Sequence, residues 1–432
     1  MITGRQQEGF SLIELMVGLV IGLVAILVIG QVMAAFEDQK RTNTGGSDAQ
    51  TNGSAALQVL EQELRMAGYG LLMPSLSGTP FNGNQFCPLG VNIQYSGAVL
   101  SDPGAATPAP SNTLLSPVRI VDGGAAGVPD QIIVVRSDAE IGVLASTVQA
   151  NVALGAASPT ITVDSKVGYD NPGQLVLIGA ADGSKICTVM QVSAAPTQNV
   201  INTNNWDLKF AQGASYPYNP AIFGTTFASF AGASPTTYGA GDKVVNLGFS
   251  PTPPASSATA YRPFMYRRYS VLQCNSQPQL AMDDLSQTTA APSCANSQIL
   301  TDEIVDMQAQ YGIAVSGALN VSQWVDATGN WASNNLTAAR INQIKAIRIA
   351  VVSRSPQYIK NDATCSANPV ATASIVEWAK LNAGDDAPAT FTVPVGADTC
   401  QHYRYKVFTT VVPLKNAIWS RLCYDPTANP CS

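Results

Sequence analysis

The chain opens with a long, uninterrupted apolar segment that has a single carboxylate beside it. From Leu15 to Phe36, every residue except Gln31 is apolar or glycine, which is long enough to cross a bilayer as a helix. Glu14 stands directly before this run. An ionised carboxylate in hydrocarbon costs roughly 2.5 kcal/mol or more, so an intramembrane glutamate is a functional residue by default and needs a partner.

The helical pattern continues beyond the apolar run but becomes amphipathic. Residues 37–41 are polar, and the glycine pair Gly45–Gly46 predicts a kink or local unwinding. Gly68 follows as the expected C-cap. We expect the second half of the helix to lie on a globular domain, while the first half lies in membrane or filament. Its apolar stripe consists of Leu57, Leu60, Leu64 and Ala67.

Beyond Pro74 the pattern becomes that of strands separated by turn-rich loops. Two of the runs flank residues 181–184, whose turn residues predict a hairpin. The expected strands cover residues 131–136, 160–163, 174–179, 186–192, 305–311, 346–352 and 403–412.

Two C-terminal segments have patterns specific enough to predict packing. In the last expected strand, Tyr403, Tyr405, Val407 and Val411 fall on one face, which indicates a half-buried strand. Between residues 335 and 345 a short helix is expected. Its packing residues are Leu336, Ile341 and Ile344.

Composition and charge indicate an extracytoplasmic, β-rich head. Only 12% of the residues are charged, and small and polar residues are abundant in the loops. The formal net charge of -6 leaves no broad basic surface, so nucleic acid is not an expected partner. The part of the chain beyond the helix is long enough for one large or two ordinary domains.

The cysteines indicate an oxidising compartment. All eight lie beyond the apolar segment, and an even number there predicts disulfides. None forms Cys-x-x-Cys and His402 is the only histidine, so no metal is expected. Sequence leaves 105 pairings open. The nearest-neighbour scheme pairs Cys87 with Cys187, Cys274 with Cys294, Cys365 with Cys400, and Cys423 with Cys431.

The N-terminal residues 9–14, Gly-Phe-Ser-Leu-Ile-Glu, resemble the class III signal of type IV prepilins and type II secretion pseudopilins. The resemblance implies that prepilin peptidase cleaves after Gly9 and that Phe10 becomes an N-methylated terminus. It also implies that Glu14, the fifth mature residue, pairs with the terminal amine of a neighbouring subunit. The implied domains are a leader (1–9), a helix (10–67, with 10–36 in membrane or filament core and 37–67 as stem) and a head (68–432).

Further landmarks resemble, in order, those of PilW-type minor pilins. This family implies an α+β fold, with a long N-terminal transmembrane and stem helix followed by an antiparallel β-sheet head with long loops and disulfides. It implies a structural role in priming the filament near the pilus tip, with no cofactor. Implied partners are other minor pilins, the major pilin, prepilin peptidase, the inner-membrane assembly platform and a large tip adhesin. The landmarks are residues 64–69, 130–135, 307–312, 346–349 and 407–416.

Other interpretations of the chain remain open. Residues 32–34 could end a cleaved secretory signal, and Gly18-x-x-x-Gly22 would suit helix packing in a plain membrane anchor. A GspJ-like pseudopilin of type II secretion resembles this chain but is usually much smaller. A third class is an adhesin that binds through the loops at 75–130 and 196–260.

Motifs for catalysis, metal or nucleic acid are weak. Residues 179–185 resemble a phosphate loop only superficially, and no Gly-x-Ser-x-Gly elbow is present, so no enzymatic activity is expected. Residues 326–335 lack EF-hand spacing. Residues 261–269 alternate basic and aromatic side chains as single-strand binders do, although a strand with one solvated face explains the run better.

Overall fold

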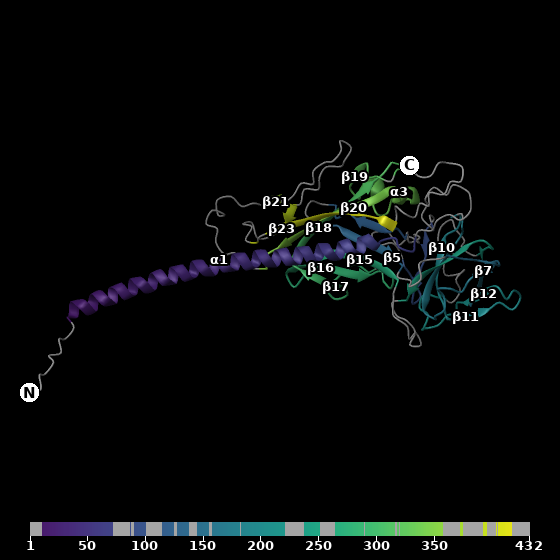
Figure 1. Cartoon of the computed structure of the whole chain (residues 1–432), viewed down its shortest axis with the longest axis horizontal. Coiled ribbons are helices and arrows are strands. Elements are labelled where there is room, and N and C mark those ends of the chain that lie inside the picture. The colour runs from purple at the N-terminus through teal and green to yellow at the C-terminus, as the bar shows by residue number, and fades with distance from the viewer. Residues whose placement is uncertain are drawn as a thin grey trace, which may run out of the picture.

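The structure combines one very long helix with a head of antiparallel sheets, which confirms the α+β expectation (Figure 1). The computed structural model describes residues 11–71, 87, 90–100, 115–124, 128–137, 145–154, 158–181, 183–220, 237–250, 264–288, 290–315, 318, 320–356, 372–374, 392–394, 403 and 405–416.

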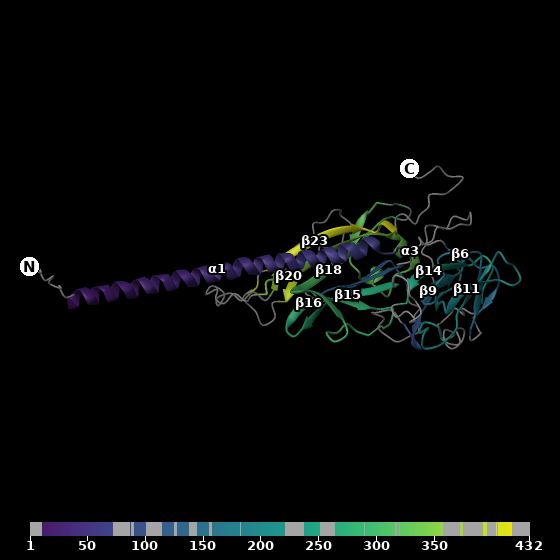
Figure 2. The ribbon, with the colours of Figure 1, turned by 60° about the horizontal axis from the view of Figure 1, so that its bottom comes forward.

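Helix α1 (Leu12–Met66) runs without interruption for 55 residues, half outside the head and half along it (Figures 1 and 2). The unwinding expected at Gly45–Gly46 is therefore wrong. Gly45 is buried against the head, and tertiary packing outweighs the weak helix propensity of glycine. The helix ends before Gly68, which has a positive φ of 75° and donates its N–H to the carbonyl of Val135 over 2.8 Å.

Two antiparallel sheets hold the second half of α1. One has the strand order β17-β16-β15-β5-β4 and the other β19-β18-β20-β23. Their facing side chains and the helix share a single apolar core. The first sheet comprises β4 (Val118–Val121), β5 (Gln131–Arg136), β15 (Met265–Cys274), β16 (Gln277–Asp284) and β17 (Gln298–Asp302), and the second β18 (Ile304–Ile313), β19 (Gln323–Val325), β20 (Ile344–Arg354) and β23 (Tyr405–Pro413).

A second group of strands, here called the distal module (described parts of residues 87–100 and 145–250), lies at the end of the head away from the free end of α1 (Figures 1 and 2). Its main sheet has the order β1-β10-β9-β14-β6, and a smaller one has β11-β12-β8. The strands are β1 (Val91–Asn92), β2 (Gln94–Tyr95), β3 (Ala98–Val99), β6 (Ser146–Thr147), β7 (Val152–Ala153), β8 (Thr160–Val163), β9 (Gln174–Gly179), β10 (Cys187–Gln191), β11 (Ala194–Gln198), β12 (Trp206–Lys209), β13 (Thr237–Tyr238) and β14 (Lys243–Phe249).

Most of the distal module is inserted between two strands that pair with each other. The chain leaves β5 at Arg136 and returns in β15, where Met265 lies opposite Arg136 in the ladder. Strand β5 is buried on both faces: Ile132 and Val134 face the helix core, whereas Ile133 and Val135 belong to a second core shared with the distal module. The module is therefore joined to the helix-binding part through the reverse face of one sheet.

Several expected elements are confirmed. The strands at 131–136, 160–163 and 174–179 have those bounds, and the hairpin expected around residues 181–184 joins β9 to β10. Strands β18 and β20 extend the predicted runs at both ends. The short helix appears as α3 (Ala338–Gln343), after the 3-10 turn η1 (Gly329–Trp331), and its three expected packing residues are all buried.

The last strand buries the face opposite to the one predicted. Val411 is exposed, whereas Val412 is fully buried and belongs to the helix core. Phe408, on the same face as Val412, lies against α1. Both faces of this strand carry apolar residues, so the two-residue period of the sequence could not show which face is buried. Two further short strands, β21 (Thr372–Ser374) and β22 (Thr392–Pro394), pair in antiparallel orientation.

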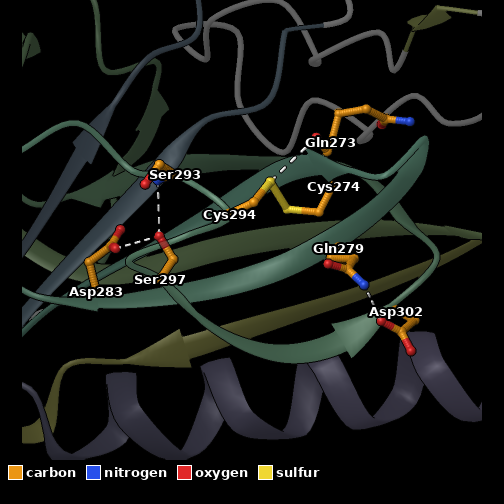
Figure 3. Close-up of a disulfide and its surroundings, with 8 residues drawn as sticks. All are labelled: Gln273, Cys274, Gln279, Asp283, Ser293, Cys294, Ser297 and Asp302. Carbon is orange, nitrogen blue, oxygen red and sulfur yellow. Dashed lines mark hydrogen bonds between the residues drawn. A yellow bond between two sulfur atoms is a disulfide. The ribbon is translucent and has the colours of Figure 1, made fainter.

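Two disulfides reinforce different parts of the head. Cys87 pairs with Cys187 inside the distal module, with Cα atoms 5.4 Å apart, and joins its two chain segments. Cys274 pairs with Cys294 and fastens the β16–β17 connection to the end of β15, with Cα atoms 5.7 Å apart (Figure 3). These are the pairs of the nearest-neighbour scheme. Cys365, Cys400, Cys423 and Cys431 lie outside the described residues.

We expect the Cys87–Cys187 bridge to contribute more stability than the Cys274–Cys294 bridge. It closes a loop of 100 residues against 20, and loop entropy gives about 4 to 5 kcal/mol for the longer loop and about 3 kcal/mol for the shorter. Urea unfolding of the detergent-solubilised chain, with each pair changed to serine, measures the difference. Equal losses of unfolding free energy in the two variants, or a larger loss on removal of the Cys274–Cys294 bridge, would show that loop entropy does not dominate the stabilisation by these bridges.

Candidate functional site

The free half of α1 is the most conspicuous surface of the molecule. Residues Leu12–Glu37 form a 26-residue segment long and apolar enough to cross a membrane, and none of its most apolar window is buried in the chain itself. Its large apolar side chains are between 48 and 77% exposed. Such a continuous apolar surface requires lipid or other helices to cover it. We call this segment the apolar stem.

Glu14 lies in the first turn of the apolar stem, in a capping box with Ser11. The Ser11 N–H donates to Glu14 Oε2 over 3.1 Å, and the Ile13 N–H donates to Ser11 Oγ over 3.3 Å. The positive end of the helix dipole favours the carboxylate there. Within the described part of the chain no cation pairs with it. Gly9 and Phe10, the expected cleavage and methylation positions, lie outside the described residues.

Gly18 and Gly22 lie on the exposed stem. A Cβ atom added at either position would meet nothing within 4 Å. The fold of the chain itself therefore does not require glycine there. Their absent side chains would let the backbone of a second helix approach closely.

Inside the head, small residues bring α1 very close to its sheet. A Cβ added to Gly53 would lie 2.2 Å from the Phe408 ring and 2.8 Å from Ser353 Oγ. Ser353 Oγ also donates a hydrogen bond to the carbonyl of Ala49 over 2.7 Å. The buried stripe begins about three turns earlier than the expected one, and Leu57, expected in it, is only half-buried. It consists of Gly45, Ala49, Gly53, Ala56, Leu60, Leu64 and Ala67. In the sequence, the helical spacing of the small residues 49, 53 and 56 indicates that the buried stripe starts earlier than Leu57.

Glu63 connects α1 to the other sheet through two arginines. Its Oε1 lies 3.1 Å from Arg267 NH1 and its Oε2 lies 3.4 Å from Arg136 Nε, in β15 and β5 respectively. The Glu63 side chain is only 15% exposed. The two ion pairs stabilise the junction between α1 and the sheet. Without its arginine partners, a carboxylate buried to this extent would lower the stability of the fold. Sequence reasoning missed this residue.

The basic and aromatic run at 261–269 supplies part of this connection. Arg267 binds Glu63, and the Nε and NH2 atoms of Arg268 each lie 3.1 Å from Asp283 Oδ2 (Figure 3 shows Asp283). Both guanidinium groups therefore neutralise carboxylates of the chain itself, one in α1 and one in the head.

The C-terminal end of α1 is capped by the C-terminal part of the chain. Asn416 Nδ2 donates to the carbonyl oxygens of Met66 and Ala67, over 3.3 and 3.1 Å. These are carbonyls that a helix end leaves without partners. The C-terminal part of the described chain is thus attached to the point where the helix stops.

Two buried carboxyl groups lie where β18 meets the start of β5. Asp130 accepts the N–H groups of Gly123 and Ala309, over 2.9 and 2.8 Å, yet burial raises its pKa to about 7. Burial likewise raises the pKa of Asp306 to about 6. Asp306 Oδ2 has no hydrogen-bond partner among the described residues. Both groups therefore resist ionisation in the folded state.

The weak motifs have structural roles. Lys185, in the segment that resembles a phosphate loop, pairs with Asp242 over 2.9 Å in the β9–β10 region. In the part of the chain that the structure describes, no group of three His, Cys, Asp or Glu residues could hold a metal ion. His402 lies outside that part.

Gly53→Ala should destabilise the docking of α1 by about 1 to 3 kcal/mol, because the added methyl overpacks the contact with Phe408 and Ser353. Gly46→Ala is the matched control: its Cβ meets nothing within 4 Å, so it should stabilise the helix by roughly 0.5 to 1 kcal/mol. Urea unfolding of the two variants in detergent measures both values. Similar effects of the two substitutions would contradict the close packing at Gly53.

The stability of the head should fall as pH rises from about 4 to about 7. The folded pKa values of Asp130 and Asp306 are raised, so the unfolded chain loses these protons first. Stability is therefore fully present below the unfolded pKa, near 4, and is lost as pH passes the folded values. Unfolding free energies measured from pH 4.5 to 8 should decline by a few kcal/mol.

Asp306→Asn should flatten this decline between pH 4.5 and 6, because the amide removes the charge and Oδ2 has no hydrogen bond to lose. Asp170→Asn is the control, since Asp170 is half exposed and should leave the profile unchanged. A wild-type stability that rises over this range, or a variant with an unaltered slope, would contradict the burial of these carboxyls.

Two known families match separate parts of the chain. Residues 268–416 match the family described as type IV pilus-assembly protein W. Residues 4–30 match the prokaryotic N-terminal methylation motif. Neither a curated protein nor a solved structure matches the chain significantly.

The matched regions coincide with the structural parts described above. Residues 268–416 run from within β15 to Asn416 and include strands β16 to β23 and the cap on α1, whereas β4, β5 and the distal module lie outside them. The methylation motif covers the capping box and most of the apolar stem. The two matches together support a type IV pilin of the PilW type, a membrane-anchored minor pilin that is later assembled into the pilus.

Proposed function

We propose that this minor pilin joins other minor pilins and the major pilin in the complex that starts filament assembly, and that it remains near the pilus tip. The carrying observation is the apolar stem, which the chain leaves uncovered and which bears a carboxylate with no cation of its own. It acts as a structural subunit rather than as an enzyme. The matched pilus-assembly family supports this role.

Processing prepares the stem for this role. Prepilin peptidase removes residues 1–9 after Gly9, and Phe10 becomes the methylated terminus, so that helix 10–67 and head 68–432 form the mature subunit. The match to the methylation motif over residues 4–30 supports these assignments. Glu14 is then four residues from a positively charged amine that also needs a partner.

Assembly transfers the stem from lipid to a bundle of like stems, through the inner-membrane assembly platform. Both surroundings are apolar, so the transfer itself gives little hydrophobic free energy, and packing and polar pairing must favour association. Gly18 and Gly22 allow close helix contact. Pairing of Glu14 with the terminal amine of a neighbour removes two unpaired charges at once and therefore favours a defined register.

The distal module supports a position at the tip. It enlarges the head at the end away from the stem (Figures 1 and 2). In a filament shaft, each head must leave room for the subunits on every side, whereas a subunit at the tip has none beyond it. A larger adhesin could be presented from the same place.

A pseudopilin of type II secretion would use the same stem chemistry. The match to a pilus-assembly family favours the pilus. The genes adjacent to this one would distinguish the two systems directly.

Glu14→Ala should leave membrane insertion and cleavage intact, because a more apolar helix inserts more readily. Assembly should suffer, because the neighbour's amine would be left unpaired at a cost of roughly 3 to 5 kcal/mol. Glu14→Gln should fare little better, since the amide keeps the shape but not the charge. The measurement is the amount of each variant in sheared pili and its co-purification with partner pilins.

Mass spectrometry of the same samples provides the control for processing. Wild type and both variants should begin at an N-methylated Phe10, and a bulky residue at position 9 should block cleavage. Incorporation of both Glu14 variants at wild-type levels would show that the carboxylate does not drive docking. A mature terminus at Ala35 would instead indicate an ordinary secretory signal and overturn the proposed function.

A further inference from the structure

The loop that joins β11 to β12 exposes two apolar side chains almost completely. Val200 is 92% exposed and Ile201 is 93% exposed. Among the large apolar residues that the structure describes, these are the most exposed, including those of the apolar stem. We call residues 199–205 the distal loop.

The distal loop is held in shape by its own polar groups. Asn199 Oδ1 accepts the N–H groups of Ile201 and Asn202, over 3.0 and 2.9 Å. At the base of the loop, the Asn199 N–H donates to the Asn205 carbonyl over 2.9 Å, and Gln198 Nε2 donates to the Thr203 carbonyl over 2.7 Å. None of these bonds uses the side chain of Val200 or Ile201, so the fold does not require apolar residues there.

A second set of bonds attaches the loop to its sheet. Asn199 Nδ2 donates to Asp207 Oδ1 over 2.9 Å, and Asp207 Oδ1 also accepts the hydroxyl of Thr162, in β8. The loop is thus preorganised on all three strands of the smaller sheet. A preorganised loop loses little conformational entropy on binding, and β-branched side chains such as Val and Ile have few rotamers to lose.

We propose that the distal loop is a docking point that inserts Val200 and Ile201 into an apolar pocket of an extracytoplasmic protein partner. The loop lies in the distal module, at the end of the head away from the stem (Figures 1 and 2). A membrane-anchored chain therefore presents it away from the bilayer. The priming role does not depend on this contact.

Charge and size favour a protein pocket over a lipid surface. Residues 193–206 contain no charged side chain, and the chain has a net charge of -6. Peripheral membrane binding depends on basic residues and on a broad apolar face, and two side chains provide neither. Two rigid apolar anchors surrounded by neutral polar groups instead match the central part of a protein interface with its polar rim.

The adjacent edge strand argues against docking through strand addition. Strand β11 is at the edge of the smaller sheet and contains Pro196, which has no N–H to donate. Its ladder with β12 also has a register shift between Ala194 and Thr197. Proline and ladder irregularities protect edge strands from pairing with another chain. Recognition must then come from the side chains of the loop.

The test places a photoactivatable crosslinker, p-benzoylphenylalanine, at exposed Thr203 of the full chain in piliated cells. The double variant Val200→Asn/Ile201→Asn is compared with Val315→Asn, which changes a 67% exposed valine after β18. We expect a protein adduct of one defined mass that is absent from the double variant and retained in Val315→Asn. The adduct partner, identified by mass spectrometry and purified, should bind the detergent-solubilised full chain at least tenfold more weakly when both apolar residues are replaced.

Recovery of the double variant in sheared pili at the wild-type level is expected, and it shows that the variant folds and assembles. A failure of this inference thus remains distinct from a failure of the proposed function. The inference is overturned by the absence of a protein adduct, by crosslinking to lipid or glycan, by an adduct that persists in the double variant, or by an affinity that changes less than tenfold.

Discussion

The close packing of α1 between two sheets is the contact on which the rest of the structure depends. One uninterrupted helix lies in two different environments. Its first half suits hydrocarbon or other stems, and its second half packs in a protein core. Its residues differ accordingly. The stem carries large, exposed side chains, whereas the docked half presents Ala49, Gly53 and Ala56 where Phe408 and Ser353 approach most closely. Because the helix is continuous through Gly45–Gly46, the stem leads directly into this packed joint.

The same joint explains how a large extra module can be accommodated. The distal module departs from Arg136 and returns at Met265, neighbours in one ladder, so its insertion leaves the pairing of β5 and β15 intact. The helix core and the module core use opposite faces of β5. A change in the distal module therefore need not disturb the helix, which fits a family match that covers residues 268–416 and not the module.

Sequence alone predicted the parts that depend on local pattern. A long apolar run and a nearby carboxylate identify the stem and Glu14 without tertiary information, and strands such as β5 and β9 follow from short apolar runs between turns. The expected unwinding at Gly45–Gly46 and the expected inner face of β23 were wrong, because packing against the head decides both. Glu63 was missed for a similar reason: its partners, Arg136 and Arg267, are 73 and 204 residues away in sequence. Residues 196–240 show no clear period, so β11, β12 and their loop could not be predicted.

Two glutamates of α1 differ in whether the folded chain supplies a cation to neutralise them. Glu63 pairs with two arginines of the head, so the folded chain itself supplies its cations. Glu14 finds only a backbone N–H among the described residues, and a single such bond does not replace a cation in an apolar medium. We propose that the cation that Glu14 requires comes from another subunit. An amine buried in the same apolar bundle would have the converse requirement, so under this proposal each subunit satisfies its neighbour while its own head is already folded.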